Sequence, residues 1–231
     1  MRTEAVLFDY GMTLVAFEYP AAALLEVMES VRPWLGDDPP TAEWLLFHVL
    51  HPLETDLDTL CGEREVAYMD FYAKAWQRAG LDLDPDVLLR ILDLEQQCWD
   101  RAVTIAPGAF ELLDRIRARG IRTGICSNAP FPVEMMRRQV AAIGLLERMD
   151  AVVFSSAVGW RKPAPELYRA ALTELRATAE RTLFVGDKVK EDYLGPQSIG
   201  MRAVIFTGLS GRPAPEDLPT IASLGELESL L

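Results

Sequence analysis

Side chains that could bind a metal ion or a phosphate group follow several short apolar runs of the sequence. They are Asp9, Ser127, Asn128, Lys162, Asp187 and Asp192. Carboxylate oxygens are the ligands that Mg²⁺ prefers, and hydroxyl and ammonium groups can hydrogen-bond phosphoryl oxygens. If the fold brings these groups together, they can form one site for a metal ion and a phosphate.

The apolar runs predict the sheet that would bring these groups together. Each run is short and lacks the strict alternation of a half-buried strand, so it fits a strand buried on both faces of a parallel sheet. The runs are Ala5–Phe8, Ile121–Cys126, Ala151–Phe154, Thr182–Val185 and Ala203–Phe206. Ligands of open parallel sheets bind outside the carboxyl ends of the strands. The polar residues stand at those ends or in the loops that follow them.

Segments with helical spacing separate the runs. They are Phe110–Arg119, Val133–Ile143 and Pro165–Leu175, with a further short helix at Leu224–Leu231. Strands and helices in alternation predict an α/β sheet with right-handed crossovers.

The region from about Pro20 to Thr104 has a different pattern. Its periodic segments all have helical spacing, and turn-forming residues separate them. The segments are Ala21–Val31, Thr41–His51, Glu63–Ala79 and Pro85–Trp99. We expect an all-helical insert placed after the first strand of the sheet.

The charge balance limits the kinds of partner. The 231 residues include 35 acidic and 23 basic residues, for a net charge of -12. Nucleic-acid binding requires clustered Lys and Arg, so we expect a small molecule rather than a nucleic acid. A phosphorylated small molecule remains compatible with this balance, because a bound Mg²⁺ can make one pocket locally positive.

The cysteines and the apolar runs indicate the compartment. Cys61, Cys98 and Cys126 are far apart and lack metal-ligand spacing, which is typical of free thiols in a reducing environment. The first apolar run is too short for a signal peptide, and no segment approaches the roughly 20 apolar residues that span a membrane. We therefore expect a cytoplasmic protein with no membrane partner, either a monomer or a homodimer.

Taken together, the motifs resemble those of the haloacid dehalogenase-like (HAD) hydrolase superfamily. The family's DxDGT motif after an apolar strand is matched by LFDYGMTL, and its strand ending in Ser or Thr by GICSNA. Its lysine motif is matched by GWRKPAPELY, and its GD motif with a later Asp by VGDKVKED. All four occur in the family's order and cover nearly the whole chain. The resemblance implies a Rossmann-like parallel-sheet core at 1–17 and 105–231, with a helical C1-type cap at 18–104.

The resemblance also implies a Mg-dependent phosphatase that acts on a small phosphorylated metabolite. Asp9 would be the nucleophile, forming an aspartyl-phosphate that water then hydrolyses. Lys162 would pair with both the nucleophile and the phosphate. Ser127, the following Asn128 and Thr13 would bind the substrate.

The metal ligands are implied in the same way. Asp9, the backbone carbonyl of Gly11 and Asp187 would supply oxygen ligands to Mg²⁺. Asp192 would support the metal or orient Lys162. The ion would let an anionic carboxylate approach an anionic phosphate.

The sequence departs from the family pattern two residues after the nucleophile. The family's phosphatases usually carry a second Asp there, which protonates the leaving group and then activates the water; this chain has Gly11. General acid–base catalysis contributes about 10²–10⁴-fold. We therefore expect aryl and acyl phosphates to suffer least, and phosphorylated Asp9 to accumulate. Lys188 and Glu18 are candidates to replace the missing proton donor.

Three other functions have some support in the sequence. The dehalogenase branch also lacks the second Asp and usually has Tyr at that position, but Tyr10 falls one place early and the metal carboxylates are retained. The phosphonate-cleaving branch needs a cap lysine, and the insert offers only Lys74. A non-catalytic binding protein is supported only by Gly11. Burying the predicted charged groups together would be costly without a functional reason.

Overall fold

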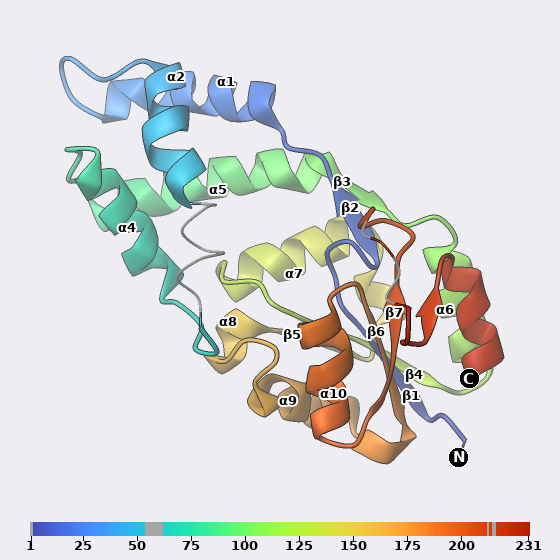
Figure 1. Cartoon of the computed structure of the whole chain (residues 1–231). Helices are drawn as coiled ribbons and strands as arrows, with labels where there is room; N and C mark the ends of the chain where they lie inside the picture. The colour runs from blue at the N-terminus through green and yellow to red at the C-terminus, as the bar shows by residue number, and fades with distance from the viewer. Residues whose placement is uncertain (1, 54–61, 212, 214–215) are drawn as a thin grey trace. The chain divides into compact units, whose positions relative to one another are not determined.

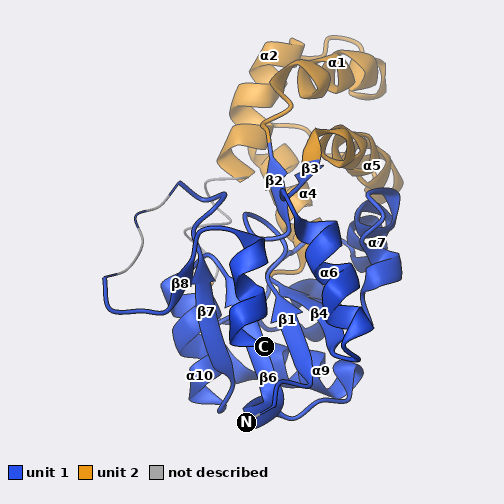
Figure 2. Ribbon diagram, turned by 90° about the vertical axis from the view of Figure 1, so that its right-hand side faces the viewer, with its two compact units in different colours: residues 1–17, 63–65, 104–231 blue, residues 18–62, 66–103 orange. Residues whose placement is uncertain are grey.

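The structure is a computed structural model that describes residues 2–53, 62–211, 213 and 216–231. Cys61 therefore lies outside the described residues. The chain divides into two compact units, shown in different colours in Figure 2. Unit 1 comprises residues 1–17, 63–65 and 104–231, and unit 2 comprises residues 18–62 and 66–103.

Unit 1 contains a six-stranded sheet in which every neighbouring pair is parallel, as predicted (Figure 1). The strand order is β5-β4-β1-β6-β7-β8. The strands are β1 (Ala5–Phe8), β4 (Arg122–Ser127), β5 (Ala151–Phe154), β6 (Thr182–Gly186), β7 (Arg202–Phe206) and β8 (Thr220–Ile221). All five predicted strands are present, and the sheet has one further short edge strand, β8, that was not predicted. The α/β fold class predicted from the sequence is confirmed.

Helices cover both faces of this sheet. α6 packs on β4 and α7 on β5, whereas α9 packs on β4 and β5 and α10 on β7. Right-handed crossovers place the first two helices on one face and the last two on the other. The helices are α6 (Ala109–Ala118), α7 (Val133–Ala142), α8 (Ser155–Val158), α9 (Pro165–Leu175) and α10 (Gly195–Ser198). The predicted C-terminal helix is instead a 3₁₀ helix, Leu224–Leu230.

The helix α9 illustrates how the sequence forms this layer. Pro165 occupies the first turn, where its missing N–H leaves no hydrogen bond unmade. Leu167, Ala171 and Leu175 recur at helical spacing and are buried against alternate residues of the strands, including Leu7. This packing buries side chains of β1, β4, β5 and β6 on one face of the sheet.

Unit 2 is built from helices, which are α1 (Ala21–Val31), α2 (Ala42–Leu45) with a π-helical turn (Leu46–Leu50), α4 (Tyr68–Arg78) and α5 (Pro85–Ala102). The helix predicted from Glu63 begins only at Tyr68, because Glu63–Glu65 belong to unit 1. Thr41 and Asp84 cap α2 and α5 through their side chains.

Two short strands, β2 (Val15–Phe17) and β3 (Val103–Ile105), pair with each other. They lie where the chain leaves unit 1, after Phe17, and where it returns to unit 1, at Thr104. Among the described residues, none of the helices combines the length and the apolar character that crossing a lipid bilayer requires.

We predict that the lack of a side chain at Gly124 stabilises the protein, because it lets β4 lie close to β1 and β5. A Cβ atom at this position would lie 3.0 Å from Leu7 Cδ2 and 3.1 Å from the Ala151 carbonyl oxygen. We expect Gly124→Ala to lower the free energy of unfolding by about 1–3 kcal/mol, measured by urea denaturation. The control is Gly225→Ala, whose nearest neighbour is Ser223 Oγ at 4.0 Å. Equal stability of both variants would contradict the prediction.

Candidate active site

Asp9 lies directly beyond β1, at the carboxyl edge of the sheet. Its backbone N–H donates to the Val185 carbonyl oxygen (2.8 Å), so the β1–β6 ladder continues through Asp9 and fixes its position. The side chain is buried, and Oδ1 accepts a hydrogen bond from Lys162 Nζ at 2.7 Å. The predicted nucleophile and the predicted lysine, far apart in sequence, are thus in direct contact.

Lys162 is buried between two carboxylates. Its ammonium donates to Asp9 Oδ1 (2.7 Å) and to Asp192 Oδ1 (2.6 Å). Burial alone would lower the pKa of this ammonium, but the charges of Asp192 and Asp9 more than offset burial and raise the pKa well above its ordinary value. Lys162 therefore stays protonated and serves as a fixed positive charge.

Asp192 lies in a π-helical turn, Val189–Leu194, and is fully buried. Oδ1 accepts from Lys162, and Oδ2 accepts from the backbone N–H of Lys188 at 2.9 Å. Burial raises the pKa of this carboxyl, against the opposing effect of Lys162. The carboxylate lies so close to Gly186 that a Cβ there would be 2.3 Å from Asp192 Cγ. The glycine of the GD pair is therefore required by space.

Asp187 completes a cluster of three buried carboxylates. Asp9, Asp187 and Asp192 each offer one oxygen, and these oxygens all lie within 4.8 Å of one another. The only cation that the described contacts bring to Asp9 and Asp192 is Lys162. Two of the carboxylates share the Lys162 ammonium, and Asp187 adds a third carboxylate oxygen donor beside them. The set of oxygen donors therefore fits Mg²⁺.

Asn128 joins the loop after β4 to the loop that carries Lys162. Its Oδ1 accepts from the Lys162 backbone N–H (2.7 Å), and its Nδ2 donates to the Lys162 carbonyl oxygen (3.3 Å). Ser127 is the last residue of β4 and is buried at the same sheet edge. The structure therefore shows Asn128 in contact with the lysine loop, which the sequence did not indicate.

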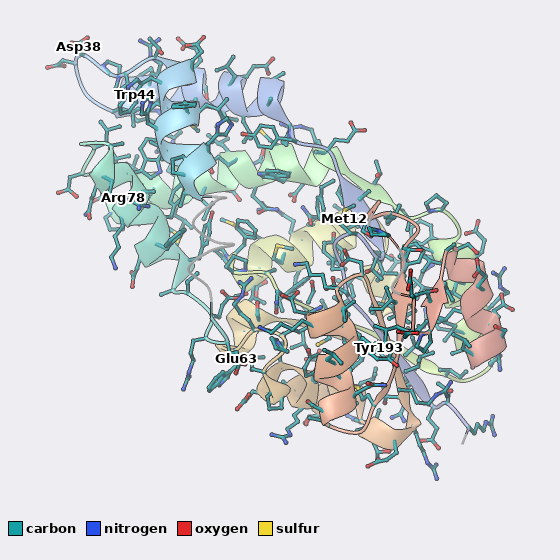
Figure 3. All side chains as sticks on the ribbon, viewed as in Figure 1. Met12, Asp38, Trp44, Glu63, Arg78 and Tyr193 are labelled. Carbon is teal, nitrogen blue, oxygen red and sulfur yellow. The ribbon has the colours of Figure 1, made fainter. Side chains whose placement is uncertain are left out.

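The loop after Asp9 is tight and includes one strained residue. Met12, labelled in Figure 3, has φ 58°, a left-handed conformation rare for a residue with a side chain. Thr13 is buried, and its Oγ1 has no hydrogen-bond partner among the described residues. A buried hydroxyl without a partner is costly, and a bound phosphoryl oxygen could supply one.

An aromatic ring lies beside Gly11. A Cβ atom at Gly11 would be 3.3 Å from Phe17 Cε2, so an aspartate here would press on this ring. The ring of Phe17 also meets Tyr10 edge-on, with centroids 6.0 Å apart. The sequence showed the absence of the second Asp, but it did not show that Phe17 lies beside Gly11.

The remaining candidate residues have other contacts or belong to the other unit. Tyr10 is buried and its hydroxyl donates to Gln139 Oε1 at 3.0 Å. Lys188 is exposed and pairs with Glu191 at 3.3 Å. Burial raises the pKa of the Cys126 thiol to about 12, so this thiol remains protonated. Glu18 belongs to unit 2.

These motifs and their geometry agree with a family comparison. A family model described as haloacid dehalogenase-like hydrolase matches residues 3–200. The chain belongs to the haloacid dehalogenase-like hydrolase family. The resemblance inferred from the sequence is thereby confirmed, and the protein is a hydrolase.

Several curated relatives of this HAD-like hydrolase are phosphatases. The chain is 25% identical to the ribulose-1,5-bisphosphate 5-phosphatase of Halopiger xanaduensis, with 98% of each protein covered. It is 34% identical to the phosphoglycolate phosphatase of Rhodospirillum rubrum over 54% of this chain and 48% of that protein. It is 33% identical to the human haloacid dehalogenase-like hydrolase domain-containing protein 3, over 45% and 40% respectively. The chain thus spans about half or less of the last two relatives.

Solved structures with the same fold include both kinds of hydrolase. A HAD phosphatase from Thermococcus onnurineus superposes with a TM-score of 0.69 at 22% identity, covering 100% of this chain and 97% of the other. A 2-haloacid dehalogenase from Pseudomonas syringae pv. Tomato gives a TM-score of 0.70 at 21% identity, covering 100% and 98%. These similarities show the fold and do not separate the two chemistries.

We predict that the strain at Met12 can be relieved. A left-handed conformation costs a residue with a side chain roughly 1–2 kcal/mol, whereas glycine adopts it freely but loses more chain entropy on folding. Met12→Gly should therefore raise the free energy of unfolding by roughly 1 kcal/mol or less, measured by urea denaturation. Met12→Ala keeps the strain and should bring no gain. A gain in Met12→Ala equal to that in Met12→Gly would show that the side chain, rather than the backbone, is responsible.

Proposed function

We propose that this HAD-like hydrolase is a Mg²⁺-dependent phosphatase that acts through an aspartyl-phosphate at Asp9. The observation that supports this most is the buried cluster of three carboxylates, two of which contact Lys162, at the carboxyl edge of the sheet. Asp9, Asp187 and the Gly11 carbonyl would hold the ion, with Asp192 behind them. When bound, Mg²⁺ would offset negative charge on the phosphoryl oxygens and on Asp9.

In the first step, Asp9 would attack phosphorus through Oδ2, the oxygen that Lys162 does not engage. The new bond joins Asp9 to phosphorus, and the bond from phosphorus to the ester oxygen breaks with its electron pair leaving on that oxygen. Lys162, held protonated by its neighbours, would orient Asp9 and bind a phosphoryl oxygen. Ser127, the Asn128 backbone N–H and Thr13 would hydrogen-bond the remaining oxygens.

In the second step, water would attack the aspartyl-phosphate and release inorganic phosphate and the free Asp9 carboxylate. This step normally uses a base, and the first normally uses an acid; Gly11 supplies neither. Lys188, paired with Glu191, and Glu18 stay candidates for this role. We therefore propose substrates whose leaving oxygen needs little protonation, and a covalent intermediate that is hydrolysed slowly.

The proposed substrate is a small phosphorylated metabolite. Relatives named as ribulose-1,5-bisphosphate 5-phosphatase and phosphoglycolate phosphatase support this class, and the net charge of -12 disfavours a nucleic acid. We propose that residues 18–104 act as the cap that selects the substrate. We also propose a reducing cytoplasmic location, compatible with the buried free thiols Cys98 and Cys126, and a monomer or homodimer with no membrane partner.

Two observations disfavour dehalogenation. The hydroxyl of Tyr10 is bonded to Gln139 in the buried interior of unit 1. Attack on carbon needs no metal. Two further carboxylates that could bind a metal, Asp187 and Asp192, nevertheless lie beside Asp9. Lys74, the cap lysine that phosphonate cleavage would require, is exposed on α4.

Mg²⁺ is predicted to stabilise the protein as well as to activate it. A ligand at 100 times its dissociation constant adds about 2.7 kcal/mol to the free energy of unfolding. We expect Mg²⁺ to raise the melting temperature of the native protein and to be required for hydrolysis of p-nitrophenyl phosphate. Asp187→Asn should lose the thermal shift, and Asp9→Asn should lose the hydrolysis. Asp114→Asn, a surface control, should keep both. No Mg²⁺ effect on native melting or turnover would refute the proposal.

We predict that the missing acid is restored most effectively when Phe17 is made smaller at the same time. Gly11→Asp alone places its side chain against Phe17, whereas Gly11→Asp with Phe17→Ala frees the position. Acid–base catalysis contributes about 10²–10⁴-fold, so the double variant should hydrolyse alkyl phosphates up to that much faster than the native protein. p-Nitrophenyl phosphate, with its good leaving group, should gain less. The control is Gly11→Asn with Phe17→Ala, which has similar shape but carries no proton donor; an equal gain there would exclude proton transfer as the cause.

A further inference from the structure

A short segment, Glu63–Glu65, leaves unit 2 and joins unit 1. Gly62 before it and Val66 after it both belong to unit 2, so the chain enters and returns within a few residues. We name Glu63–Glu65 the strap. Glu63 is labelled in Figure 3, where the strap runs beside the loop that follows α8.

The strap pairs with the three residues that precede Lys162. The Arg161 backbone N–H donates to the Glu63 carbonyl oxygen (2.8 Å), and the Glu65 N–H donates to the Gly159 carbonyl oxygen (3.1 Å). Between them, Arg64 and Trp160 form an antiparallel bridge. The strap therefore holds the backbone of Gly159–Arg161 as a neighbouring strand would.

Side chains reinforce this pairing on the outside. The Arg64 guanidinium lies 3.6 Å from the centroid of the Trp160 ring, within the range of a cation–π interaction. Backbone and side-chain contacts together leave the strap in contact with each residue of the loop from Gly159 to Arg161. This loop leads directly into Lys162.

The Glu65 carboxylate is the buried centre of the contact. Its side chain is 2% exposed, and its two oxygens accept from Arg161 Nη1 at 2.9 and 3.1 Å. The Ser155 hydroxyl also donates to Glu65 Oε2. A buried carboxylate is stable only when paired and hydrogen-bonded, so Glu65 requires both partners in place.

Ser155 connects Glu65 to the loop that follows β4, which contains Asn128 and Ala129. Its Oγ accepts from the Ala129 backbone N–H (2.8 Å), and the Ser156 N–H donates to the Ala129 carbonyl oxygen (3.2 Å). Ala129 follows Ser127 and Asn128 directly. Glu65 thus contacts one residue beside the Ser127–Asn128 loop and one beside Lys162, while Asn128 hydrogen-bonds the Lys162 backbone.

We infer that Glu65 is a positioning residue that fixes both loops so that Lys162 is held against Asp9 and Asp192. The inference rests on the proposed function for its catalytic consequence. Glu65 touches no reacting atom; it acts through Arg161 and Ser155. The insert between the first strand and α6 therefore supplies part of the framework of the site, in addition to its proposed role in substrate choice.

The alternative is that the Glu65–Arg161 pair serves stability alone. In that case, removing Glu65 would lower the melting temperature without a specific effect on the two loops. Misplacement of a catalytic group by about 1 Å can cost on the order of 100-fold in rate. A positioning role therefore predicts a large fall in kcat when the two loops become more mobile.

The test compares Glu65→Gln and Glu65→Ala with the native protein. Glutamine fills the space and still accepts from Ser155, but removes the charge that pairs with Arg161, which keeps one variant informative if alanine impairs folding. Asp114→Asn is the matched control, because it removes a carboxylate from an arginine partner, Arg148 (3.0 Å), in another part of unit 1. Two properties are measured: amide hydrogen exchange of peptides covering 127–129 and 159–162, and kcat with p-nitrophenyl phosphate and Mg²⁺.

We expect faster exchange in both loops for the Glu65 variants, with kcat lowered on the order of 10- to 100-fold. The Mg²⁺ concentration for half-maximal activity should stay unchanged, and Asp114→Asn should behave as the native protein. Unchanged exchange in both loops, or faster exchange with native kcat, would overturn the inference. If the native protein hydrolyses nothing with Mg²⁺, the proposed function fails, and the exchange result, which needs no substrate, decides alone whether Glu65 fixes the loops.

Discussion

The ion triplet of Lys162 with Asp9 and Asp192 is the constraint on which the rest of the site depends. A lysine that is almost fully buried would lose its proton without opposing charges, and two such carboxylates would repel each other without the lysine. The three groups come from the loop before α9, the end of β1 and the turn after β6, so they meet only in the assembled sheet. Asp187 then places a third buried carboxylate beside them, and such a cluster of carboxylate oxygens suits a divalent cation.

Several local features exist because these charges must be close together. Gly186 has no side chain because the Asp192 carboxylate occupies the space where a Cβ would lie. The side-chain amide of Asn128 hydrogen-bonds both the N–H and the carbonyl oxygen of Lys162, which restrains the backbone of the lysine. The buried Glu65 carboxylate forms a second ion pair with Arg161, the residue before Lys162. Each of these residues restricts a backbone segment, and each is explained by the position of a charge rather than by packing of the apolar core.

The sequence predicted what depends on local pattern. The apolar runs became strands and α9 spans Pro165–Leu175 as expected, because burial and periodicity are encoded residue by residue. The convergence of Asp9 and Lys162 followed from parallel topology and from the resemblance of four motifs. The strap could not be predicted in this way: Glu63–Glu65 continue a helical pattern, and only pairing with Gly159–Arg161, far along the chain, takes them out of the helix. The contact of Phe17 with Gly11 is likewise a tertiary contact that no spacing reveals.

That contact changes the meaning of Gly11. Loss of an acidic residue in an otherwise intact site would be a simple deletion if the space remained open. Here the Phe17 ring lies 3.3 Å from where the Cβ would stand, and it is itself held by Tyr10, whose hydroxyl is anchored to Gln139. A side chain at position 11 would thus press on a partly buried aromatic ring that has its own ring contact. A proton donor beside a ring would be poorly solvated when charged, so glycine and phenylalanine form a consistent pair. Asp9, Lys162 and the acidic cluster are present, while an aromatic ring lies beside Gly11; under the proposed function, this arrangement would favour leaving groups that depart without a proton.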